Sequence, residues 1–321
     1  MNMVKIHKLD HIKKALDDIN LDEIIESGFA AYSVGDVITP PVGELVFEDP
    51  PGDTHIKYGY IKEDDYFVIK IASGFYENYK FNLPSGSGLM LVFSQKTGAL
   101  DTILLDEGYL TNVRTAVAGQ IVAKYLAPDK INKIGVFGTG TMARMQVQYL
   151  KSITDCIQVV VWGRSELSLE KYKKDMQEIG YEVEVTQDPN NISCSCNLIL
   201  MTTPSTVPLL NCSNLRPGMH ITAMGSDTHD KQELESRILN QADIVVTDSL
   251  EQCKLRGEIH HGLNEGHIKL NEIFELGQVI LGRKRLRTSE EQITVADLTG
   301  IAAQDIQIAK AACKALEACS S

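Results

Sequence analysis

The sequence lacks several features that mark common classes of protein. No run of apolar residues approaches the roughly 20 that a membrane-spanning helix needs. Residues 1–20 also lack the apolar core of a signal peptide. Basic residues are not in excess, since 31 Lys and Arg stand against 43 Asp and Glu, a net charge of −12. Nucleic acids and anionic membranes attract basic surfaces, so neither is an expected partner. These absences favour a cytoplasmic protein and leave open a small anionic ligand held by a few local cations.

Paired cysteines are missing as well. The seven cysteines are odd in number and dispersed, and only Cys194 and Cys196 lie close together. No spacing indicates a zinc site, so we predict reduced thiols and no bound metal. His260 and His261 form the one histidine pair. Adjacent side chains tend to diverge, so we expect hydrogen bonding rather than metal binding from this pair.

The pattern of the chain changes near residue 118. Helical spacing of apolar residues predicts two short helices over residues 8–32. Short β-rich runs separated by Pro, Gly, Asn and Ser fill residues 55–105 and predict an antiparallel sheet of about four or five strands. Residues 108–127 then predict a helix that stops before Pro128.

Strands and helices alternate from residue 133 onward. Strands are predicted at 133–138, 158–163, 181–186, 196–203, 220–226 and 242–248, and helices at 141–152, 166–179 and 231–241. This alternation is typical of a parallel sheet with right-handed crossovers. A last helix is predicted at 302–318. We therefore predict an α/β fold in which a Rossmann-type NAD(P)-binding domain (119–300) is inserted in a smaller α+β domain (1–118 plus 301–321).

A glycine turn follows the first of these strands. The sequence matches G-x-G-x-x-G/A, in which the first glycine permits a tight turn and the second lets the backbone approach a pyrophosphate. A small third residue packs the helix close to the strand, and the helix N-terminus offers N–H groups to phosphates. A purely structural turn fits the pattern too, but its place at the start of the alternating series favours a dinucleotide site. The matching residues are Gly138, Thr139, Gly140, Thr141, Met142 and Ala143.

The end of the second predicted strand bears on the choice of cofactor. NAD sites carry an acidic residue there, which binds the ribose 2′-hydroxyl. Here the strand ends in Gly163, Arg164 and Ser165. Arg164 can form a charge-assisted pair with a 2′-phosphate, which favours NADP(H) over NAD(H). A solvated surface role for Arg164 is the structural alternative. A later strand is followed by residues that would line the nicotinamide side: Thr202, Thr203 and Pro204.

Seven segments are spread in order over nearly the whole chain: VIKIASGFYEN (68–78), LPSGSGLMLVFSQKTGAL (83–100), LTNVRTAVAG (110–119), GTGTMA (138–143), MGSDTHDKQEL (224–234), GEIHHGL (257–263) and DLTGIAAQD (297–305). Together they are similar to motifs of the ornithine cyclodeaminase/mu-crystallin family. The resemblance implies an NAD(P)-dependent cyclodeaminase, a ketimine or cyclic-imine reductase, or an alanine dehydrogenase-like enzyme. It also implies a homodimer that pairs through the domain without the nucleotide.

The resemblance implies roles for three side chains. Arg114 would hold the substrate carboxylate in a bidentate fork, and Lys70 would bind a carboxylate or polarise the reacting carbon–nitrogen group. Asp227 would act as the acid/base that exchanges a proton at the substrate nitrogen. The residues alone leave structural roles open: a snorkelling strand lysine, a helix-surface cation and a helix N-cap.

The remaining predicted cofactor residues lie around the same motifs. Met224, Gly225 and Ser226 precede the proposed acid/base, and Thr299 belongs to the last motif. Asp297 and Thr299 are expected to lie near the nicotinamide or at the hinge to the first domain.

The chain departs from the family at one point. The family often has an arginine in the early proline-flanked loop, as a further carboxylate ligand, but residues 40–45 contain none and Glu44 adds a negative charge. Lys70 and Arg114 are then the strong cation candidates. We predict reduction of a cyclic imino acid, such as 1-pyrroline-2-carboxylate to L-proline, with NADPH. The alternatives are an ornithine cyclodeaminase (L-ornithine to L-proline and ammonia), an alanine dehydrogenase-like or open-chain imino acid reductase, and a non-catalytic, mu-crystallin-like NADPH carrier.

Overall fold

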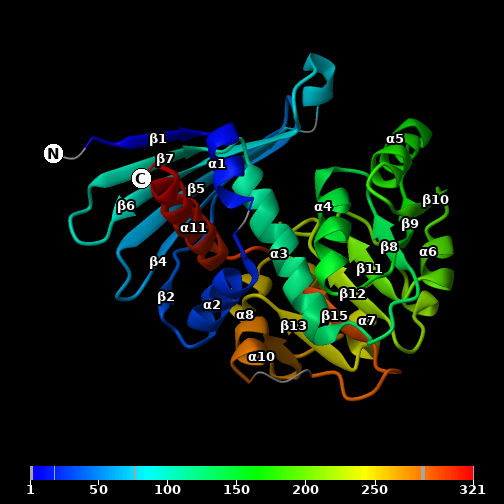
Figure 1. Cartoon of the computed structure of the whole chain (residues 1–321). Helices are drawn as coiled ribbons and strands as arrows, with labels where there is room; N and C mark the ends of the chain where they lie inside the picture. The colour runs from blue at the N-terminus through cyan, green and yellow to red at the C-terminus, as the bar shows by residue number, and fades with distance from the viewer. Residues whose placement is uncertain (1–2, 18, 76, 283–285, 321) are drawn as a thin grey trace. The chain divides into compact units, whose positions relative to one another are not determined.

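The computed structural model describes residues 3–17, 19–75, 77–282 and 286–320 (Figure 1). The chain forms two compact units. Unit 1 comprises Met1–Arg114 and Ile301–Ser321, and unit 2 comprises Thr115–Gly300. The units divide inside helix α3 (Tyr109–Leu126), four residues before the position expected from the sequence (118 − 114 = 4).

Unit 1 is built on a seven-stranded sheet with the order β1-β7-β6-β5-β4-β2, in which β3 also pairs with β4. Strands β4 to β7 pair antiparallel, which confirms the predicted antiparallel sheet. Strand β1 adds in parallel to β7, which the sequence analysis missed. The strands are β1 (Lys5–Lys8), β2 (Val37–Ile38), β3 (Gly43–Phe47), β4 (Gly52–Ile61), β5 (Tyr66–Phe75), β6 (Gly86–Ser94) and β7 (Leu100–Leu105), and the helices are α1 (Leu9–Leu16), α2 (Asp22–Ser33), η1 (Asn78–Phe81) and α11 (Ala302–Ser320).

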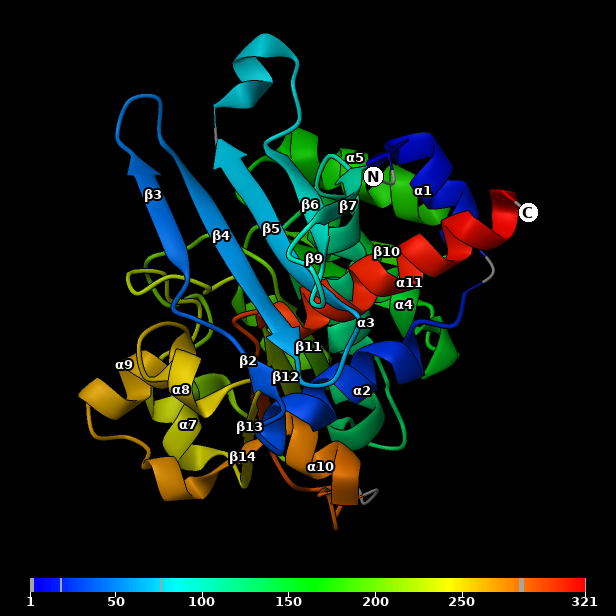
Figure 2. The same cartoon turned by 90° about the vertical axis from the view of Figure 1, so that its left-hand side faces the viewer.

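The C-terminal helix α11 crosses one face of this sheet (Figure 2). It packs on β4 and β5 and against α1 and α2, so the last helix returns to the first unit as predicted. Close approach to α2 depends on Gly28, because a Cβ there would lie 2.9 Å from Gln307 Cγ and 3.2 Å from the carbonyl oxygen of Ala303. Most of the apolar side chains of this helix are buried, and the polar side chains of Gln304 and Asp305 are buried with them.

The opposite face of the sheet carries a row of apolar residues. The register places Tyr58, Ile69, Leu91, Ile103 and Ile6 side by side on five neighbouring strands. Tyr58 is 38% exposed and Ile6 is 60% exposed. None of the helices described in unit 1 covers these two residues, and such a row on a sheet face is a typical protein–protein contact surface.

Unit 2 is an eight-stranded sheet in which every pairing is parallel. Its order is β10-β9-β8-β11-β12-β15-β13-β14, which begins with the 3-2-1-4-5 order of a Rossmann-type fold and confirms that prediction. The central strands are buried on both faces, so they appear in the sequence as continuous apolar runs. The strands are β8 (Ile134–Phe137), β9 (Gln158–Trp162), β10 (Glu182–Thr186), β11 (Leu198–Met201), β12 (His220–Ala223), β13 (Ile244–Thr247), β14 (Ile273–Glu275) and β15 (Thr294–Asp297).

Helices cover both faces of this sheet, as the crossover connections require. They are α4 (Thr141–Tyr149), η2 (Leu150–Ser152), α5 (Glu166–Gln177), α6 (Asn190–Ser195), η3 (Cys212–Asn214), α7 (Arg237–Gln241), α8 (Leu250–Cys253), α9 (Glu258–Asn264), η4 (Leu270–Glu272) and α10 (Leu276–Gly282). No helix among the described residues is long and apolar enough to cross a membrane.

One predicted helix is largely wrong. Residues 231–241 were expected to be helical throughout, but the helix begins only at Arg237. Before it, Leu234 bridges to Leu210, and the backbone amides of Leu209 and Leu210 donate to the carbonyl oxygen of Glu233. The Glu233 side chain is fully buried, so this segment is fixed by tertiary contacts that override its helical composition.

Candidate active site

The glycine turn joins β8 to α4 with a geometry that only glycine adopts easily. Gly138 has a φ of 110°, and a Cβ there would lie 2.7 Å from Thr202 Oγ1. Thr202 Oγ1 itself donates to the carbonyl oxygen of Phe137 at 2.7 Å. Strands β8 and β11 are neighbours in the sheet, and the connections from them lead to opposite sides. The turn therefore lies at the switch point, where this fold binds its ligand.

The second glycine of the turn leaves space for a ligand. Gly140 is the N-cap of α4, and a Cβ there would have no heavy atom within 4 Å. Ala143, the small third residue of the motif, is fully buried between helix and strand. A surface hollow of about 400 Å³ opens beside the turn, and its lining comprises Thr139, Gly140, Thr141, Arg144, Ser168, Lys171 and Asp175. Open space, helix N–H groups and two cations together fit the phosphates of a dinucleotide.

Arg144 is a part of this region that the sequence analysis missed. Its guanidinium pairs with Asp175 at 2.8 Å and stacks 4.9 Å above the ring centre of Tyr172. It also donates to the carbonyl oxygen of Gly140 at 3.1 Å. Arg144 thus fixes the turn to helix α5, a contact that residue spacing alone does not reveal.

The end of β9 places the other predicted cofactor residues. A Cβ on Gly163 would lie 2.8 Å from Thr139 Cγ2, so this glycine permits the approach of the two turns. Ser165 Oγ accepts a hydrogen bond from the Ser168 amide at 3.4 Å and caps α5. Arg164 is exposed, and its carbonyl oxygen accepts from Gln187 Nε2 at 2.9 Å. A cation is therefore displayed at the strand end, where the ribose lies in this fold.

The loops after β11 and β12 are joined by a single buried carboxylate. Glu233 Oε1 accepts from Thr203 N at 2.6 Å and from Thr203 Oγ1 at 2.8 Å, and Oε2 accepts from Gly225 N at 2.9 Å. Burial raises the pKa of Glu233 to about 7, although these hydrogen bonds act against the shift. Gly225 has no room for a side chain, since a Cβ there would lie 2.1 Å from Thr203 O. The structure therefore brings together two predicted cofactor residues through a third residue that was not predicted.

Asp227 follows this junction and faces a lysine. Its Oδ1 accepts from Lys231 Nζ at 2.7 Å, and about a third of its side chain is exposed. No described helix begins at Asp227, so the N-cap alternative is wrong. Ser226 Oγ donates to the carbonyl oxygen of Lys231, and Met224 is buried while Pro204 is exposed. The loop thus presents Asp227 as a partly exposed carboxylate, with Ser226 and Lys231 held beside it by hydrogen bonds.

The histidine pair and the last motif have structural contacts. His260 Nδ1 hydrogen-bonds to the carbonyl oxygen of Lys254 at 2.8 Å, and His261 Nε2 to that of Lys231 at 2.9 Å, as the sequence analysis expected. Thr299 Oγ1 donates to Asp248 Oδ1 at 3.2 Å. Within the described ranges, no group of three or more His, Cys, Asp and Glu side chains is arranged to hold a metal ion.

Asp297 is enclosed in unit 2. Its Oδ2 accepts from the amide of Ile259 at 2.8 Å, at the start of α9. Burial raises the pKa of Asp297 well above its usual value. A side chain at Gly257 would strike this carboxylate, because a Cβ there would lie 2.8 Å from Asp297 Oδ2. These contacts give Asp297 a role in fixing the helix start.

Unit 1 gathers the two predicted substrate cations around one carboxylate. Asp305 Oδ1 accepts from Arg114 Nε at 3.0 Å, and Asp305 Oδ2 lies 3.5 Å from Lys70 Nζ. Gln304 Oε1 accepts from Arg114 Nη1 at 3.1 Å. All four side chains are buried, so Lys70 is not a snorkelling lysine and Arg114 is not a surface cation. Asp227 belongs to unit 2, whereas these four residues belong to unit 1.

The ionisation of Asp305 depends on three cations. Burial alone would raise its pKa, but the charges of Lys70, Arg114 and Lys57 outweigh burial and lower it. Lys57 is only 5% exposed, and the sequence analysis missed it. The signal in the sequence was its spacing: Lys57 follows His55 by two residues on one strand, so the two side chains leave the same face of the sheet. Asp305 is the last residue of the segment DLTGIAAQD (297–305). Its signal in the sequence was that a carboxylate stands in an otherwise apolar predicted helix.

Glu44, which was expected in the proline-flanked loop, instead lies on strand β3 and pairs in register with His55 of β4. Glu44 Oε1 lies 2.8 Å from His55 Nε2, and Asp53 Oδ1 lies 4.0 Å from His55 Nδ1. The negative charge that the sequence adds at Glu44 is therefore directed at His55, on strand β4.

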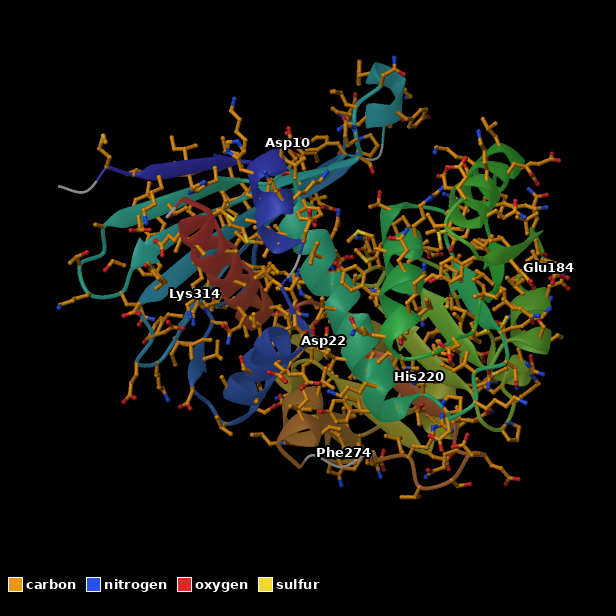
Figure 3. All side chains as sticks on the ribbon, viewed as in Figure 1. Asp10, Asp22, Glu184, His220, Phe274 and Lys314 are labelled. Carbon is orange, nitrogen blue, oxygen red and sulfur yellow. The ribbon has the colours of Figure 1, made fainter. Side chains whose placement is uncertain are left out.

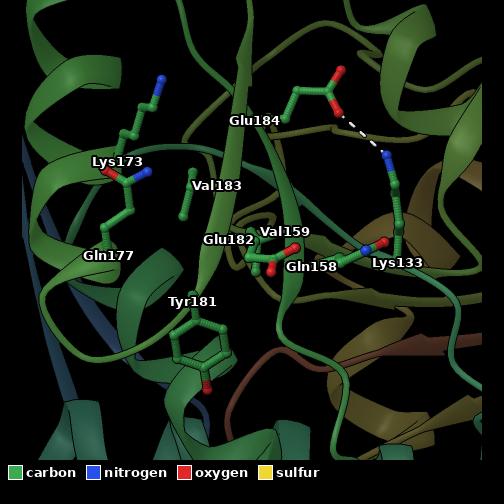
Figure 4. A pocket seen from close by; sticks show the side chains of 9 residues that line it. All are labelled: Lys133, Gln158, Val159, Lys173, Gln177, Tyr181, Glu182, Val183 and Glu184. Carbon is green, nitrogen blue, oxygen red and sulfur yellow. Dashed lines mark hydrogen bonds and ion pairs between the residues drawn. The ribbon is translucent and has the colours of Figure 1, made fainter.

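A second hollow lies at the amino ends of strands β8, β9 and β10, whereas the glycine turn lies at the carboxyl end of β8 (Figure 4). Lys133 and Glu184 in its wall pair with each other at 3.2 Å. Figure 3 shows Glu184 on the outer strand β10. Ligands of parallel sheets bind at the carboxyl ends of strands, so this hollow is separate from the candidate site.

The fold and the glycine turn define a class: proteins of two units, one of which is a Rossmann-type dinucleotide-binding domain. Within that class, the chain belongs to the ornithine cyclodeaminase/mu-crystallin family, whose sequence model matches residues 3–318. The resemblance predicted from the seven motifs is thereby confirmed.

Several relatives match over nearly the whole chain. An uncharacterized cyclodeaminase of Sinorhizobium fredii is 38% identical, covering 91% of this chain and 89% of the relative. The alanine dehydrogenase of Archaeoglobus fulgidus is 34% identical with the same coverage, and a Δ1-pyrroline-2-carboxylate reductase of Bacillus cereus is 29% identical over 91% of each chain. Among solved structures, an archaeal alanine dehydrogenase dimer with bound NAD is 30% identical, with a TM-score of 0.88 over 99% of this chain and 97% of that chain.

Proposed function

We propose that the protein is an NAD(P)H-dependent imino acid reductase, which reduces a carbon–nitrogen double bond next to a carboxylate. The observation that carries this proposal is the buried group of Lys70, Arg114 and Asp305 in a family of C–N-bond enzymes. Buried cations favour an anionic ligand, and Arg114 is oriented by Asp305 and Gln304 before any ligand binds.

The chain's own residues divide the work. Arg114 and Lys70 bind the substrate carboxylate and orient it, while Asp227 moves the proton at the substrate nitrogen, with Lys231 beside it. Gly138, Gly140 and the start of α4 hold the cofactor phosphates, with Thr203 and Gly225 fixed by Glu233 on the nicotinamide side. The bound nicotinamide supplies or accepts the hydride.

We propose NADP(H) as the preferred cofactor, because Arg164 is displayed where a 2′-phosphate would lie and no carboxylate stands in its place. The solved relative at 30% identity carries NAD, so NAD(H) is the alternative. Lys171 also lines the hollow beside the glycine turn, where it pairs with Asp175 at 2.9 Å.

Ornithine cyclodeamination is the second candidate. The relative at 38% identity is named a cyclodeaminase, and this reaction would use the same carboxylate-binding cations. The loop at residues 40–45 has no arginine, which weighs against a copy of the ornithine site. An alanine dehydrogenase-like enzyme and an NADPH carrier without turnover are further alternatives.

We also propose that the protein forms a homodimer through the open face of the unit 1 sheet. The support is the apolar row of Tyr58, Ile69, Leu91, Ile103 and Ile6, together with the dimer named for the archaeal relative. Replacing Tyr58 and Ile103 by aspartate should shift the mass measured by light scattering from dimer to monomer.

The deciding experiment combines two assays on the purified protein. In one, oxidation of NADPH and of NADH is followed with 1-pyrroline-2-carboxylate and with imines formed from 2-oxo acids and ammonium. In the other, L-ornithine is assayed for ammonia and L-proline. Cofactor oxidation without ornithine turnover supports the reductase. Ammonia and proline without net cofactor change make the protein a cyclodeaminase. Tight cofactor binding with neither activity supports the carrier.

A further inference from the structure

Helix α4 carries a buried glutamine whose side-chain amide faces helix α3. Gln146 is 0% exposed, and its Nε2 donates to the carbonyl oxygen of Thr115 at 2.9 Å. The same nitrogen donates to Met142 Sδ at 3.5 Å, one turn earlier in α4. Met142 belongs to the glycine turn motif, so one amide group contacts both the predicted cofactor turn and the backbone of α3.

Helix α3 has the space to receive this amide group. Gly119 lies one turn after Thr115, and a Cβ there would lie 1.9 Å from Gln146 Oε1 and 2.9 Å from Nε2. Ala123, a further turn along, belongs to the same buried core as Ala143 of α4. Residues four apart lie on one face of a helix, so Thr115, Gly119 and Ala123 form the face of α3 that packs against α4 (Figure 1).

The Gln146 side chain is not an optimal core residue. Among the described residues, its Oε1 has no hydrogen-bond partner, although the atom is buried. A buried acceptor without a partner loses its hydrogen bonds to water and gains none in the protein, so an apolar side chain would suit the position better. Packing alone therefore does not explain a glutamine here, and its distinctive contribution is the hydrogen bond from Nε2 to α3.

Thr115 directly follows the proposed substrate arginine. Helix α3 is continuous over its 18 residues, and the boundary between the units falls between Arg114 and Thr115. Gln146 thus fixes the first residue of α3 that belongs to unit 2. Asp305 holds the side chain of the last one that belongs to unit 1. A helix transmits rigidity along its axis, because each turn is hydrogen-bonded to the next.

We propose that Gln146 couples the binding of the cofactor to the binding of the substrate carboxylate. The coupling rests on the proposed function, in which the glycine turn holds the cofactor and Arg114 binds the carboxylate. Cofactor phosphates that bind the amides at the start of α4 order its first turn, and the Gln146 amide passes this order to α3 at Thr115. Arg114 then loses less conformational freedom when a carboxylate binds, so the second ligand binds more tightly without a change of shape. Gln146 is a positioning residue and takes no part in hydride or proton transfer.

The chain offers a matched control where it passes from unit 2 back to unit 1. Gln252 Nε2 donates to the carbonyl oxygen of Gly300, the last residue of unit 2, at 3.1 Å. It also donates to Thr299 Oγ1, in a predicted cofactor residue, at 2.8 Å. Gln304, four residues after Gly300, accepts from Arg114 Nη1 at 3.1 Å. This passage is therefore a rival route from the cofactor to the arginine, and Gln252 is its glutamine.

Amide hydrogen exchange tests the coupling with the cofactor alone. In the wild type, saturating NADPH or NADH, whichever binds more tightly, should slow exchange by about fivefold or more in the glycine turn (138–143) and in residues 110–120 of α3. Gln146→Met has a side chain of similar length without the donor, so it should keep the protection of the turn and lose that of residues 110–120. Gln252→Met should keep both.

Three results overturn the proposal. The first is that the cofactor leaves the exchange of residues 110–120 unchanged in the wild type, which needs no variant. The second is equal protection of these residues in the wild type and in Gln146→Met. The third is loss of the protection in Gln252→Met but not in Gln146→Met, which assigns the coupling to the rival route. Circular dichroism checks the fold of each variant, and Gln146→Leu is the second apolar variant.

A binding measurement adds the carboxylate. L-Proline and a reduced nicotinamide do not react with each other, so the two can be titrated together by calorimetry. Saturating cofactor should lower the Kd for L-proline by about fivefold or more in the wild type, and L-proline should lower the Kd for the cofactor by the same factor. In Gln146→Met both factors should fall to about one, while the Kd of each ligand alone stays within about threefold. If L-proline does not bind, the exchange measurement decides.

The coupling and the proposed function can fail separately. If cofactor and carboxylate are coupled through Gln146 but no imine is reduced, the reductase proposal fails and the coupling stands. If an imine is reduced although the two ligands bind independently, the coupling fails and the reductase stands. A protein that binds neither NADPH nor NADH overturns both.

Discussion

Glu233 and Thr203 are joined twice, since the same carboxylate oxygen accepts from the backbone amide and the hydroxyl of the threonine. The second oxygen of Glu233 holds Gly225, two residues before Asp227. A carboxylate that lies outside the glycine turn therefore fixes the loops on both sides of the proposed nicotinamide position. Its burial has a consequence for the response of the protein to pH.

We predict that Glu233 makes stability fall as pH rises. Burial raises its pKa from 4.5 to about 7, so the folded protein holds a proton that the unfolded chain loses above pH 4.5. The free energy of unfolding then decreases between about pH 4.5 and 7, by on the order of 3 kcal/mol. Urea unfolding at pH 5 and 7.5 should show a smaller difference for Glu233→Gln than for wild type. Glu182→Gln, on the exposed edge strand, is the control and should retain the wild-type difference.

Removing the charge of Asp305 should destabilise the protein strongly. Asp305→Asn leaves Lys70, Arg114 and Lys57 buried without the carboxylate that all three act on, which costs on the order of 3–5 kcal/mol. Glu317→Gln removes a carboxylate from the same helix, but its pair with Lys5 is exposed, so the loss should stay below about 1 kcal/mol. Similar losses for the two variants, measured by urea unfolding at pH 7, contradict this account.

The two glycines of the turn should respond differently to alanine. Gly140→Ala has open space around its Cβ and an ordinary φ of −81°, so the apo protein should keep its stability while cofactor affinity falls at least tenfold. Gly138→Ala should instead lower stability by about 1–3 kcal/mol, because of its φ of 110° and the contact with Thr202. Calorimetric titration with NADPH and NADH, together with urea unfolding, measures both effects. Unchanged cofactor affinity in Gly140→Ala would mean that the turn is only structural.

Arg164→Ala should separate the two nicotinamide cofactors. If Arg164 binds the 2′-phosphate, the Kd for NADPH should rise at least tenfold, about 1.4 kcal/mol, while that for NADH stays within about threefold. Lys173→Ala, on the neighbouring helix α5 and at the other hollow, should change neither. Equal losses for the two cofactors, or none, remove Arg164 from that role.

Asp227→Asn should lose turnover and keep cofactor binding. The amide preserves the shape of the side chain but cannot exchange a proton, so kcat should fall roughly 10²- to 10⁴-fold. The Kd for the cofactor should stay within about threefold, since Asp227 lies beside Lys231 rather than in the glycine turn. Asp230→Asn tests a carboxylate three residues away, which accepts from Thr228 Oγ1, and should keep nearly full kcat. Wild-type turnover in Asp227→Asn would exclude Asp227 as the acid/base.

The fold was largely predictable because its signals are local. Apolar runs of four or five residues and the glycine turn identify the parallel sheet, and short β-rich runs separated by Pro, Gly, Asn and Ser identify the antiparallel one. Two features were not local. Strand β1 is four residues long and is defined by its partner β7, and the helix expected at 231–236 is displaced by the burial of Glu233. Both depend on contacts that spacing along the chain does not encode.

The site was predictable only as far as its motifs reach. Arg114, Lys70 and Asp227 were predicted as site residues because each lies inside a recognisable segment. Asp305 was in such a segment as well, but its contact with Arg114 spans 191 residues, and nothing in either segment indicates the other. Lys57 was missed because a lysine on a strand usually faces water, and only the register with Lys70 shows otherwise.

The separation between Arg114 and Asp305 has a consequence for synthesis on the ribosome. At roughly 5–20 residues per second, the 191 residues from Thr115 to Asp305 take roughly 10–40 s to translate. During that interval the nascent unit 1 already contains Lys57, Lys70 and Arg114 but lacks Asp305, whose pKa these three cations lower in the folded protein. Unit 2 is continuous in sequence and is complete before helix α11 emerges. The first unit to begin is therefore the last to finish, and any message truncated before codon 301 encodes these cations without the helix that packs over them and carries Asp305.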